Sequence, residues 1–247
     1  MPPAGEVLVH IRASGVNPVD WKVRAGYLRN SIQYRLPLTI GWDVSGVIEA
    51  VGVGVEGWNR GDAVYAYPDI TRDGSYAQFI RIRATEITRK PKILSHVQAA
   101  AIPLAGLTAW QSLFDAGELT CGQTALIHAA AGGVGHLAVQ LAKWKGARVV
   151  GTASEANAGL VQELGVDEVI DYTARRFEDA LSGVDLVLDT IGGEVQQRSL
   201  GGIEVGRNSG LHGGAAAGRR SCATPGEGSR AVRSTQRHTA DRNCAGD

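Results

Sequence analysis

Three glycines between an apolar run and a helical pattern are the residues of this chain whose spacing indicates chemistry. The segment 124–154 reads TALIHAAAGGVGHLAVQLAKWKGARVVGTAS. A glycine-rich turn that opens a helix leaves backbone N–H groups free at the helix N-terminus, where they bind phosphate. We therefore predict that this turn binds the pyrophosphate of a dinucleotide. The residues expected to contact it are Ala130, Gly132, Gly133, Val134 and Gly135.

The elements on either side of the turn must place it at the edge of a sheet. The apolar run 124–129 predicts a strand, and the run 148–152, just after Gly146, predicts a second one. Between them, the apolar face of a helix is expected at Leu137, Leu141 and Trp144. Strand, glycine turn, helix and strand within about 30 residues form the βαβ unit of nucleotide-binding domains. The alternative is that the glycines only allow the helix to pack closely on its strand.

A second glycine pattern, at Gly52, Gly54 and Gly57, matches the dinucleotide fingerprint G-x-G-x-x-G letter for letter. The residues 58–62 that follow it read WNRGD, which is typical of a turn that leads into another strand. Without a helix there is no row of free N–H groups for a phosphate. We therefore predict a turn of a β domain here.

The composition excludes several classes of function. The 247 residues carry a formal net charge of zero, so the chain offers no basic field for nucleic acid or an anionic membrane. No apolar run approaches the about 18 residues of a membrane span, and the start MPPAGEVLVHIR lacks the apolar core of a signal peptide. We expect a cytoplasmic protein. Its three cysteines are far apart in sequence, and we expect free thiols at Cys121, Cys222 and Cys244.

Hydrophobic patterning predicts two domains and the fold class α/β. Residues 1–95 read as a compact all-β domain. Its predicted strands are 6–13, 43–51, 62–67 and 75–82. In residues 96–200 helical and strand patterns alternate, which predicts a doubly wound parallel sheet. Its further elements are helical segments around Pro103, helices near 157–164 and 175–181, and strands at 168–172 and 185–190.

Residues 201–247 differ in composition from the rest of the chain. They contain seven Arg and ten Gly but no Lys and no aromatic residue. Such a segment buries too little apolar surface to offset the entropy cost of ordering it, so we predict a disordered tail. Because the composition changes abruptly, we hypothesise that the tail is a frameshift product. A nucleic-acid-binding tail is the other interpretation, although its arginines are scattered and lack interleaved aromatic residues.

Seven segments, in order, resemble the medium-chain dehydrogenase/reductase superfamily, in particular its zinc-independent branch of NADPH-dependent quinone oxidoreductases and enone reductases. They are GVNPVDWKVRAG (15–26), PLTIGWDVSGVIEAVG (37–52), GDAVYA (61–66), GSYAQF (74–79), AAAIPLAGLTAW (99–110), AAAGGVG (129–135) and ELGVDEVIDY (163–172). The resemblance covers about residues 4–200. It implies a GroES-like β-barrel domain, trimmed at its N-terminus, followed by a truncated doubly wound Rossmann domain that binds NADP.

The resemblance also bears on metal binding. In zinc-dependent relatives the catalytic metal is held by a Cys in the segment that matches Gly15–Asp20, a His in the segment that matches Gly41–Asp43, and a Cys or Asp near Pro103. This chain carries Asn17 and Trp42 at the first two places. An amide and an indole cannot replace the sulfur and imidazole ligands that Zn²⁺ prefers, so we expect no metal.

The end of the second strand of the βαβ unit bears on the choice of cofactor. Folds that prefer NAD usually place Asp or Glu there to hold the ribose 2′-hydroxyl, and that carboxylate repels a 2′-phosphate. Residues 152–154 are neutral and tolerate NADPH, whereas Glu155 and the absence of a lysine at Ala158, where some relatives carry one, count against it. The residues expected around the cofactor here are Thr152 and, by resemblance, Ser154, Asn157 and Tyr172.

The resemblance implies a function and residues for it. The expected reaction transfers a hydride from NADPH to a small-molecule quinone or α,β-unsaturated carbonyl without zinc. Asn17 and Lys22 are the expected catalytic residues, with Asn17 also beside the nicotinamide, and Thr108 is expected to contact the cofactor. The alternatives are that Asn17 is a turn residue before Pro18 and that Lys22 is a solvated cation.

Two rival interpretations of the whole chain stay open. One is a catalytically inactive NADPH-binding protein of the same family, and the other is a truncated, nonfunctional product. Relatives often dimerise through the last strand of the sheet, so a homodimer is expected only if that sheet is complete.

Overall fold

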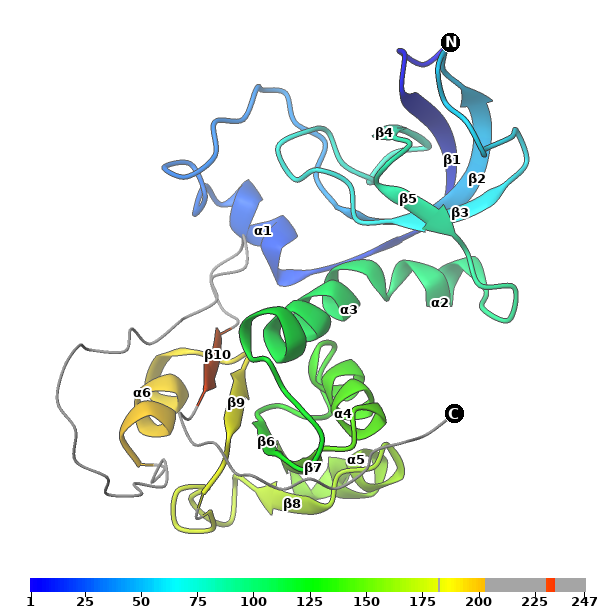
Figure 1. The fold of residues 1–247 in the computed structure, drawn as a ribbon. Coiled ribbons are helices and arrows are strands. Elements are labelled where there is room, and N and C mark those ends of the chain that lie inside the picture. Colours follow the sequence, from blue (N-terminus) through cyan, green and yellow to red (C-terminus); the bar gives the residue numbers. More distant parts are fainter. Residues whose placement is uncertain (182, 203–229, 234–247) are drawn as a thin grey trace, which may run out of the picture. The chain divides into compact units, whose positions relative to one another are not determined.

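The computed structural model describes residues 1–181, 183–202 and 230–233, which are drawn in colour in Figure 1. The chain divides into two compact units, Met1–Leu107 and Thr108–Asp247, which we describe separately. The division falls after Leu107 rather than at residue 95. Residues between these two positions belong to the first unit because His96 and Leu104 hydrogen bond to residues of its sheet.

The first unit is built on a five-stranded antiparallel sheet with the strand order β4-β1-β2-β3-β5. Four strands lie where alternating runs predict them, and the bounds of β2 are the predicted ones. β4 starts later than predicted because residues 74–76 pair with residues 39–41 instead. The bounds are β1 Glu6–Gly15, β2 Asp43–Val51, β3 Ala63–Ala66, β4 Phe79–Arg83 and β5 Ile87–Arg89.

Alternation along the strands places one face of this sheet in a hydrophobic core. Val7 and Val9 of β1 are fully buried, and so is Ile48 of β2. Ile80 and Ile82 of β4 join the same cluster, whereas Arg81 between them is exposed. The side-chain period of two that predicts these strands is therefore confirmed.

A helix, α1 (Pro18–Arg24), interrupts the strand pattern of the first unit. A prediction based on period-two runs misses it. Asn17 occupies the N-cap position, and a proline follows at the first helical position, where its missing N–H has no cost. Val19 and Val23 pack against the fully buried Trp42 in a second cluster, which fixes α1 beside β2.

Helical segments follow the sheet, as predicted around Pro103. They are α2 (His96–Ala100) and α3 (Pro103–Trp110), and α3 continues into a π-helical turn at Gln111–Ala116. Ser95 caps α2 with its hydroxyl, which accepts a backbone N–H of the first turn.

The second unit is built on a sheet with the order β10-β9-β6-β7-β8, in which β6, β7, β8 and β9 are parallel. These four strands lie where apolar runs predict them. The strands are β6 Thr124–Ile127, β7 Arg148–Ala153, β8 Glu168–Asp171 and β9 Leu186–Asp189. The helices are α4 Gly135–Trp144, a 3₁₀ turn Glu155–Asn157, α5 Ala158–Glu163 and α6 Gly193–Gly202.

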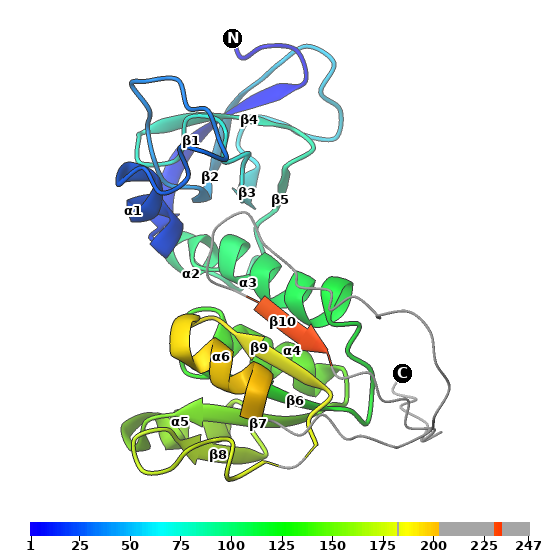
Figure 2. The ribbon, with the colours of Figure 1, turned by 90° about the vertical axis from the view of Figure 1, so that its left-hand side faces the viewer.

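Helices cover both faces of this sheet, α4 and α5 on one and α6 on the other (Figure 2). Ala125 and Ile127 of β6 lie in the cluster that contains α4 and α5. Leu126, between them, lies in another cluster, which contains Phe177 from the loop after β8 and Val195 of α6. Strands with both faces buried confirm the predicted doubly wound arrangement.

The face of α4 that packs on the sheet consists of smaller residues than predicted. Ala138, Val139 and Ala142 are fully buried there, which lets the helix lie close to β6 and β7. Trp144 is 69% exposed, so its predicted place on the buried face is wrong. Its ring instead lies 6.2 Å from that of Trp110.

The predicted helix near residues 175–181 is wrong, because this segment consists of turns and irregular backbone. Oδ1 of Asp171 accepts both the backbone N–H and the hydroxyl of Thr173, at 2.9 and 2.7 Å. These bonds close a turn just before the segment. The apolar Phe177 packs against the sheet from this loop rather than from a helix.

Two parts of the segment expected to be disordered are ordered. Gly201 and Gly202 complete α6, and β10 (Arg230–Arg233) pairs antiparallel with β9. The prediction of disorder is wrong for these residues, since β9 offers an open strand edge whose backbone can pair with any sequence. Residues 203–229 and 234–247, and the frameshift hypothesis with them, lie outside the described residues.

The literal fingerprint at Gly52, Gly54 and Gly57 forms a turn between β2 and β3, as predicted. Gly54 and Gly57 have φ values of 78° and 76°, which suit glycine in a turn. No helix lies between Val51, where β2 ends, and Ala63, where β3 begins.

Cys121 was expected to be a free thiol. Cys121 is half-buried in the turn before β6, and it is disulfide-bonded. The expected free thiol is therefore wrong for this residue, and Cys222 and Cys244 lie outside the described residues.

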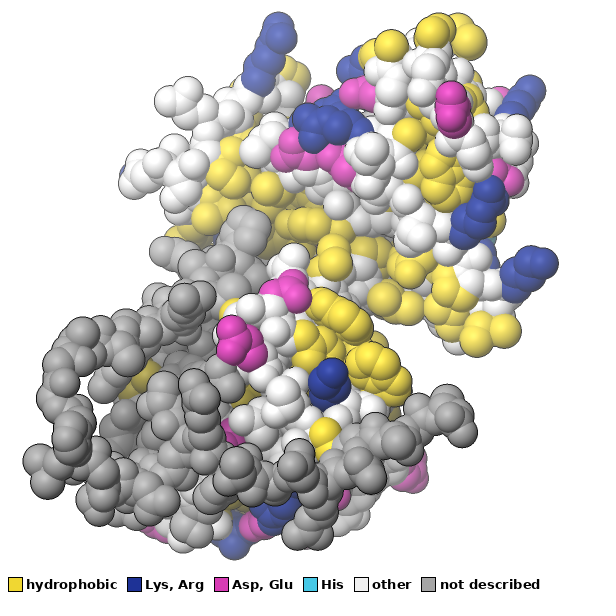
Figure 3. All heavy atoms as spheres, in the orientation of Figure 1, with side chains coloured by type: hydrophobic (Ala, Val, Ile, Leu, Met, Phe, Trp, Pro, Cys, Tyr) yellow, Lys and Arg dark blue, Asp and Glu magenta, His cyan; other side chains and the backbone are white. Residues whose placement is uncertain are grey.

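The surface of the first unit carries mixed charge. On the face shown in Figure 3, basic and acidic side chains are interspersed over this unit. Among the described residues, no helix combines the length and the apolar character needed to cross a membrane.

Candidate functional site

The glycine turn between β6 and α4 has the shape of a phosphate-binding turn. Ala129, just after β6, has a φ of 50°, a left-handed conformation that is uncommon outside glycine. The N–H of Gly132 donates to the carbonyl oxygen of Ala129 at 2.8 Å and closes the turn. Gly132 and Gly133 are exposed, so a ligand can approach the backbone at the start of α4.

Gly135 is the position in the turn that admits no side chain. An added Cβ would overlap the carbonyl oxygen of Ala129 and lie 2.8 Å from the Cα of Ala130. Both neighbours are backbone atoms, so no rotation of a side chain relieves the overlap. Gly133 has nothing within 4 Å of an added Cβ. Gly135 therefore serves the approach of α4 to its strand, and Gly133 keeps the outer side of the turn open.

A buried chain of hydrogen bonds holds the turn. Oγ1 of Thr152 accepts the N–H of Ala129 at 3.1 Å and lies 3.2 Å from Nδ1 of His128. Nε2 of His128 lies 3.0 Å from Oγ of Ser199 in α6. The hydroxyl of Ser199 donates to the carbonyl oxygen of Val195, so Nε2 is the ring nitrogen that carries the proton. Thr152, predicted as a cofactor contact, thus points to the turn and fixes its backbone.

His128 is held neutral in this chain of bonds. Burial lowers its pKa to about 4, and the nearby positive charge of Arg198 adds to the shift, while Asp189 opposes it. The ring packs edge-on against Phe177, with 4.6 Å between centroids. His128 therefore serves as a structural support of the turn.

Ser154, Asn157 and Tyr172 lie together at the carboxyl ends of β7 and β8. Nδ2 of Asn157 donates to Oγ of Ser154 at 3.1 Å, and the N–H of Tyr172 donates to the carbonyl oxygen of Ala153 at 3.4 Å. β7 and β8 are parallel to β6, so this place shares a sheet edge with the glycine turn. The contacts of these residues with a cofactor stay predictions.

In the first unit, Asn17 belongs to a buried network of carboxylates. Its Nδ2 donates to Oδ2 of Asp43 at 2.7 Å, and its backbone N–H donates to Oδ2 of Asp20 at 2.7 Å. The hydroxyl of Tyr76 donates to the same oxygen of Asp20 at 2.8 Å. Asp20 is 3% exposed and Asp43 is 1% exposed. The bond to Asp43 fixes the orientation of the Asn17 amide at the start of α1.

Asp43 lies at the centre of this network. It begins β2, and its Oδ1 accepts the N–H of Leu104 at 2.7 Å. Burial raises the pKa of Asp43 to about 6, although the hydrogen bonds from Asn17 and Leu104 counteract this effect. The negative charge of Asp20 raises the pKa further.

Three buried polar atoms near the network have no hydrogen-bond partner. They are Oδ1 of Asp20 and the hydroxyls of Tyr34 and Tyr67. Burial raises the pKa of Tyr67 to about 12, and the charges of Asp43 and Asp20 add to the shift. Unpaired buried polar groups are rare in proteins, so we expect a water molecule or a ligand group among them. Sequence reasoning missed these residues because their positions, far apart in the chain, form no motif.

We expect the free energy of unfolding of Asp43→Asn to rise relative to that of wild type as the pH increases from about 4 to about 6. A carboxyl whose pKa is raised on folding favours the folded state at low pH and loses that contribution as the pH passes its folded pKa. An amide does not titrate, so the difference should grow by up to about 3 kcal/mol across this window. Urea unfolding of both proteins at several pH values measures it. A difference independent of pH would contradict the assignment.

Lys22 and Thr108 lie on helices of different units. Lys22 is half-buried on α1, and Thr108 is buried on α3. Their predicted roles stay predictions. Trp42 is fully buried, and its Nε1 donates to the carbonyl oxygen of Arg72 at 3.1 Å, so the indole serves the core. Within the described residues, no cluster of three or more His, Cys, Asp or Glu side chains could hold a metal ion.

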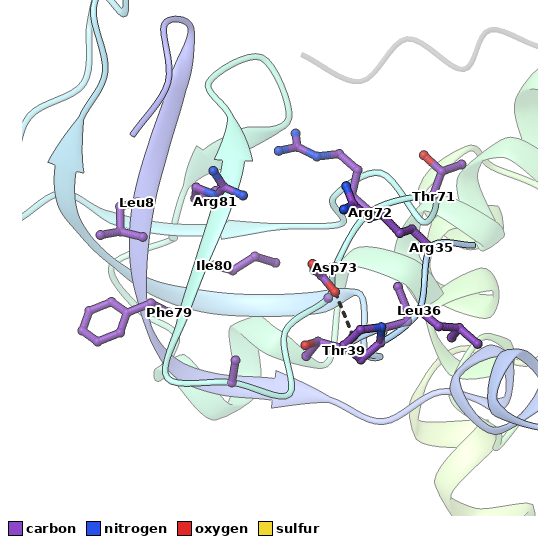
Figure 4. A pocket seen from close by; sticks show the side chains of 14 residues that line it. Leu8, Arg35, Leu36, Thr39, Thr71, Arg72, Asp73, Phe79, Ile80 and Arg81 are labelled. Carbon is purple, nitrogen blue, oxygen red and sulfur yellow. Dashed lines mark hydrogen bonds between the residues drawn. The ribbon is translucent and has the colours of Figure 1, made fainter. Parts of the chain in front are cut away.

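A separate pocket of about 650 Å³ opens on the first unit (Figure 4). Its walls are the segments 35–39 and 71–74 together with β4, and the backbone N–H of Thr39 donates to Asp73 at 2.9 Å. Neither Asn17 nor Lys22 lines it. The sequence-predicted catalytic residues therefore lie outside this pocket.

Two family models match the chain. The model of the alcohol dehydrogenase GroES-like domain matches residues 3–92, and that of the zinc-binding dehydrogenases matches residues 133–217. The second match extends beyond residue 200, where the resemblance in the sequence was expected to end.

Similar proteins and structures are oxidoreductases by name. The mitochondrial NAD(P)H oxidoreductase RTN4IP1 of Mus musculus is 37% identical over 214 residues, which cover 79% of this chain and 54% of that protein. The chain thus spans about half the length of the curated relatives it matches.

Two solved structures show the same fold over both units. A structure of an NAD-dependent alcohol dehydrogenase matches with a TM-score of 0.76 and 32% identity, over 82% of this chain and 68% of that one. The quinone oxidoreductase of Escherichia coli, complexed with NADPH, matches with a TM-score of 0.73 and 31% identity, over 83% and 64%.

Proposed function

This chain belongs to the medium-chain dehydrogenase/reductase superfamily, with a GroES-like unit followed by a Rossmann-like unit, and from that membership we propose that it is an oxidoreductase. The reaction we propose is the zinc-independent transfer of a hydride from NADPH to a quinone or an α,β-unsaturated carbonyl. The names of its relatives, which include a quinone oxidoreductase, support this reaction class.

The observation that carries the proposal is the fit of the glycine turn to a dinucleotide. A Cβ at Gly135 would overlap backbone, while Gly132 and Gly133 leave the outer side of the turn exposed. This is the combination that a pyrophosphate needs, because its oxygens must approach the backbone at a helix N-terminus. The neutral residues Thr152 and Ser154 at the end of β7 add no charge that repels a 2′-phosphate.

When bound, the nicotinamide ring supplies the hydride, and the residues of the chain bind and orient the reactants. We assign the pyrophosphate to the turn residues Ala130, Gly132, Gly133, Val134 and Gly135. Asn17, whose amide is held in place by Asp43, would lie beside the nicotinamide. Lys22 would donate to the substrate carbonyl and stabilise the negative charge that develops on its oxygen. A proton from water completes the reduction.

The residues at the metal positions support the zinc-independent reaction that we propose. The indole of Trp42 is buried in a hydrophobic cluster, and its only polar atom donates to a carbonyl. The amide of Asn17 is engaged by a carboxylate. Neither group is a zinc ligand of the kind that catalytic sites use, namely Cys, His or a carboxylate.

The rival proposal is a catalytically inactive NADPH-binding protein or a nonfunctional product of the same family, and the experiment below distinguishes both from an enzyme. A homodimer and a location in the cytoplasm stay predictions, and several relatives carry the word mitochondrial in their names.

The experiment that tests the proposal is a titration of the purified full chain with NADPH, followed by an assay of NADPH oxidation with a simple quinone in the presence of a zinc chelator. We expect a rise in melting temperature with NADPH and steady oxidation that the chelator leaves unchanged. Stabilisation without oxidation would identify the inactive cofactor-binding protein. The absence of both would identify the nonfunctional product.

A further inference from the structure

Two exposed aromatic side chains lie close in the chain to the residues that we assign to the reacting groups. Trp21, on α1, is 47% exposed, and Tyr27, in the turn that follows, is 61% exposed. Trp21 comes four residues after Asn17, the N-cap of α1. Residues four apart share one face of a helix, and a helical side chain points back toward the N-terminus. The indole therefore covers the turn that Asn17 begins, and Lys22 is the next residue in the chain.

The packing of α1 on the first unit uses other side chains. Val19 and Val23 belong to the cluster around Trp42, and neither Trp21 nor Tyr27 is a member of it. The two aromatic rings therefore add apolar surface on a side of α1 that this cluster does not cover.

The turn after α1 holds the two rings against each other. The N–H of Gly26 donates to the carbonyl oxygen of Val23 at 2.9 Å. The N–H of Tyr27 donates to the carbonyl oxygen of Lys22 at 3.0 Å. Gly26 has a φ of 82°, the left-handed conformation that ends many helices in this way. The turn brings the Tyr27 ring to 5.6 Å from the Trp21 ring, with 85° between their planes, so the pair is oriented before a ligand binds.

An oriented and half-exposed indole suits a flat conjugated ring as its ligand. Aromatic rings attract one another in offset stacks beyond the apolar area that they bury. Stacking on an aromatic side chain also tolerates different substituents, because each flat ring offers a π face. A small acyclic enone has no ring and gains little from such a surface.

We propose that Trp21, supported by Tyr27, is a specificity-determining residue on which the ring of an aromatic quinone stacks. The inference rests on the proposed function, and it names fused-ring quinones, rather than small acyclic enones, as the substrates that the chain favours. Lys22 keeps the contact with the carbonyl oxygen. The quinone gains a hydride from NADPH and a proton from water, which together give the hydroquinone and NADP⁺. Trp21 takes no part in these bonds, so it should act on KM rather than on kcat.

The test measures kcat/KM of the full chain for the NADPH-dependent reduction of 1,4-naphthoquinone and of methyl vinyl ketone. We expect Trp21→Ala to lower the ratio of the first value to the second at least about fivefold, through a higher KM for the naphthoquinone, which corresponds to about 1 kcal/mol of lost stacking. A second readout needs no turnover. The dissociation constant of 2-naphthol, which accepts no hydride, should rise by a similar factor when calorimetry is performed with the chain saturated with NADP⁺.

Two further substitutions at the same position separate stacking from apolar contact. Trp21→Phe keeps a flat ring and should restore the ratio to within about threefold of wild type. Trp21→Leu keeps apolar volume without a ring and should lower the ratio as Trp21→Ala does. A leucine variant with the ratio of wild type would show a general hydrophobic contact and contradict the proposal.

Phe79→Ala is the matched control. Phe79 is 43% exposed on β4 of the same unit, and its ring stacks on that of His10 with 4.7 Å between centroids. It thus removes an aromatic ring of similar exposure from a strand rather than from α1. We expect the ratio to stay that of wild type. Equal melting temperatures of the variants and wild type show that the fold is intact.

The outcomes separate this inference from the proposed function. If wild type reduces neither compound, the proposed function fails and the inference with it. If wild type reduces both compounds and Trp21→Ala keeps their ratio, the inference alone is wrong. The two rings then form only the hydrophobic contact that accompanies a helix end of this kind.

Discussion

Gly135→Ala should abolish the stabilisation of this chain by NADPH and lower its own stability by about 2–4 kcal/mol. The added Cβ would meet the carbonyl oxygen of Ala129 and the Cα of Ala130, which are backbone atoms of the same turn. α4 must therefore move away from β6, and the turn that receives the pyrophosphate opens. Thermal unfolding with and without NADPH measures both effects.

Two other glycines provide matched controls. Gly159→Ala lies in α5 with open space around the new Cβ, and alanine is the better helix former, so stability should rise by about 0.5–1 kcal/mol. Gly133→Ala also meets nothing in the free protein. We expect it to preserve the melting temperature but to weaken NADPH binding, because its Cβ occupies the side of the turn from which a phosphate approaches. A Gly135→Ala protein that still binds NADPH as wild type does would exclude the turn as the cofactor site.

His128→Ala should lower the stability by about 3 kcal/mol and weaken NADPH binding as well. The substitution leaves a cavity between Phe177 and the sheet, and it removes the bonds to Thr152 and Ser199. Thr152 then loses the partner that orients its hydroxyl toward Ala129. Urea unfolding measures the loss, and His136→Ala, on the half-exposed first turn of α4, is the control, with an expected effect below about 1 kcal/mol.

The same histidine should make the wild type sensitive to acid. The pKa of His128 is about 4 in the folded protein and close to 6.5 in an unfolded chain. As the pH falls through 6.5 the unfolded chain takes up a proton that the folded protein does not, so stability decreases until the pH reaches about 4. The loss over this window is on the order of 3 kcal/mol and should be absent from His128→Ala. A variant with the same acid sensitivity as wild type would refute this origin.

Much of the fold can be predicted from the sequence because its signals are local. The segments that form β2, β7 and β8 show the hydrophobic pattern of strands in their own sequence, and turn residues follow them. The glycine turn is local as well, since the strand, Gly135 and the helix are neighbours in sequence. Prediction fails where tertiary contacts decide the structure. Phe177 packs against the sheet from a loop where a helix was expected at 175–181, and the backbone of β10 pairs with β9 despite a sequence without strand character.

The candidate site was predicted unevenly for the same reason. Asn17 was identified from a motif, but the partners that orient it, Asp43 and Asp20, are defined by hydrogen bonds and burial that sequence spacing does not reveal. Tyr76 joins them from a position 56 residues beyond Asp20. Thr152 was predicted as a residue around the cofactor, whereas its hydroxyl faces the backbone of Ala129, and only the structure shows this direction.

The bond between His128 and Ser199 limits how far this domain can be shortened. Ser199 lies 71 residues after His128, yet it is the partner of the ring that supports Thr152 and, through it, the backbone of the glycine turn. The βαβ unit is therefore not a self-sufficient cofactor-binding module. A minimal fragment that ends after β9 would leave a buried imidazole N–H unpaired, whereas one that includes α6 retains the whole support of the turn.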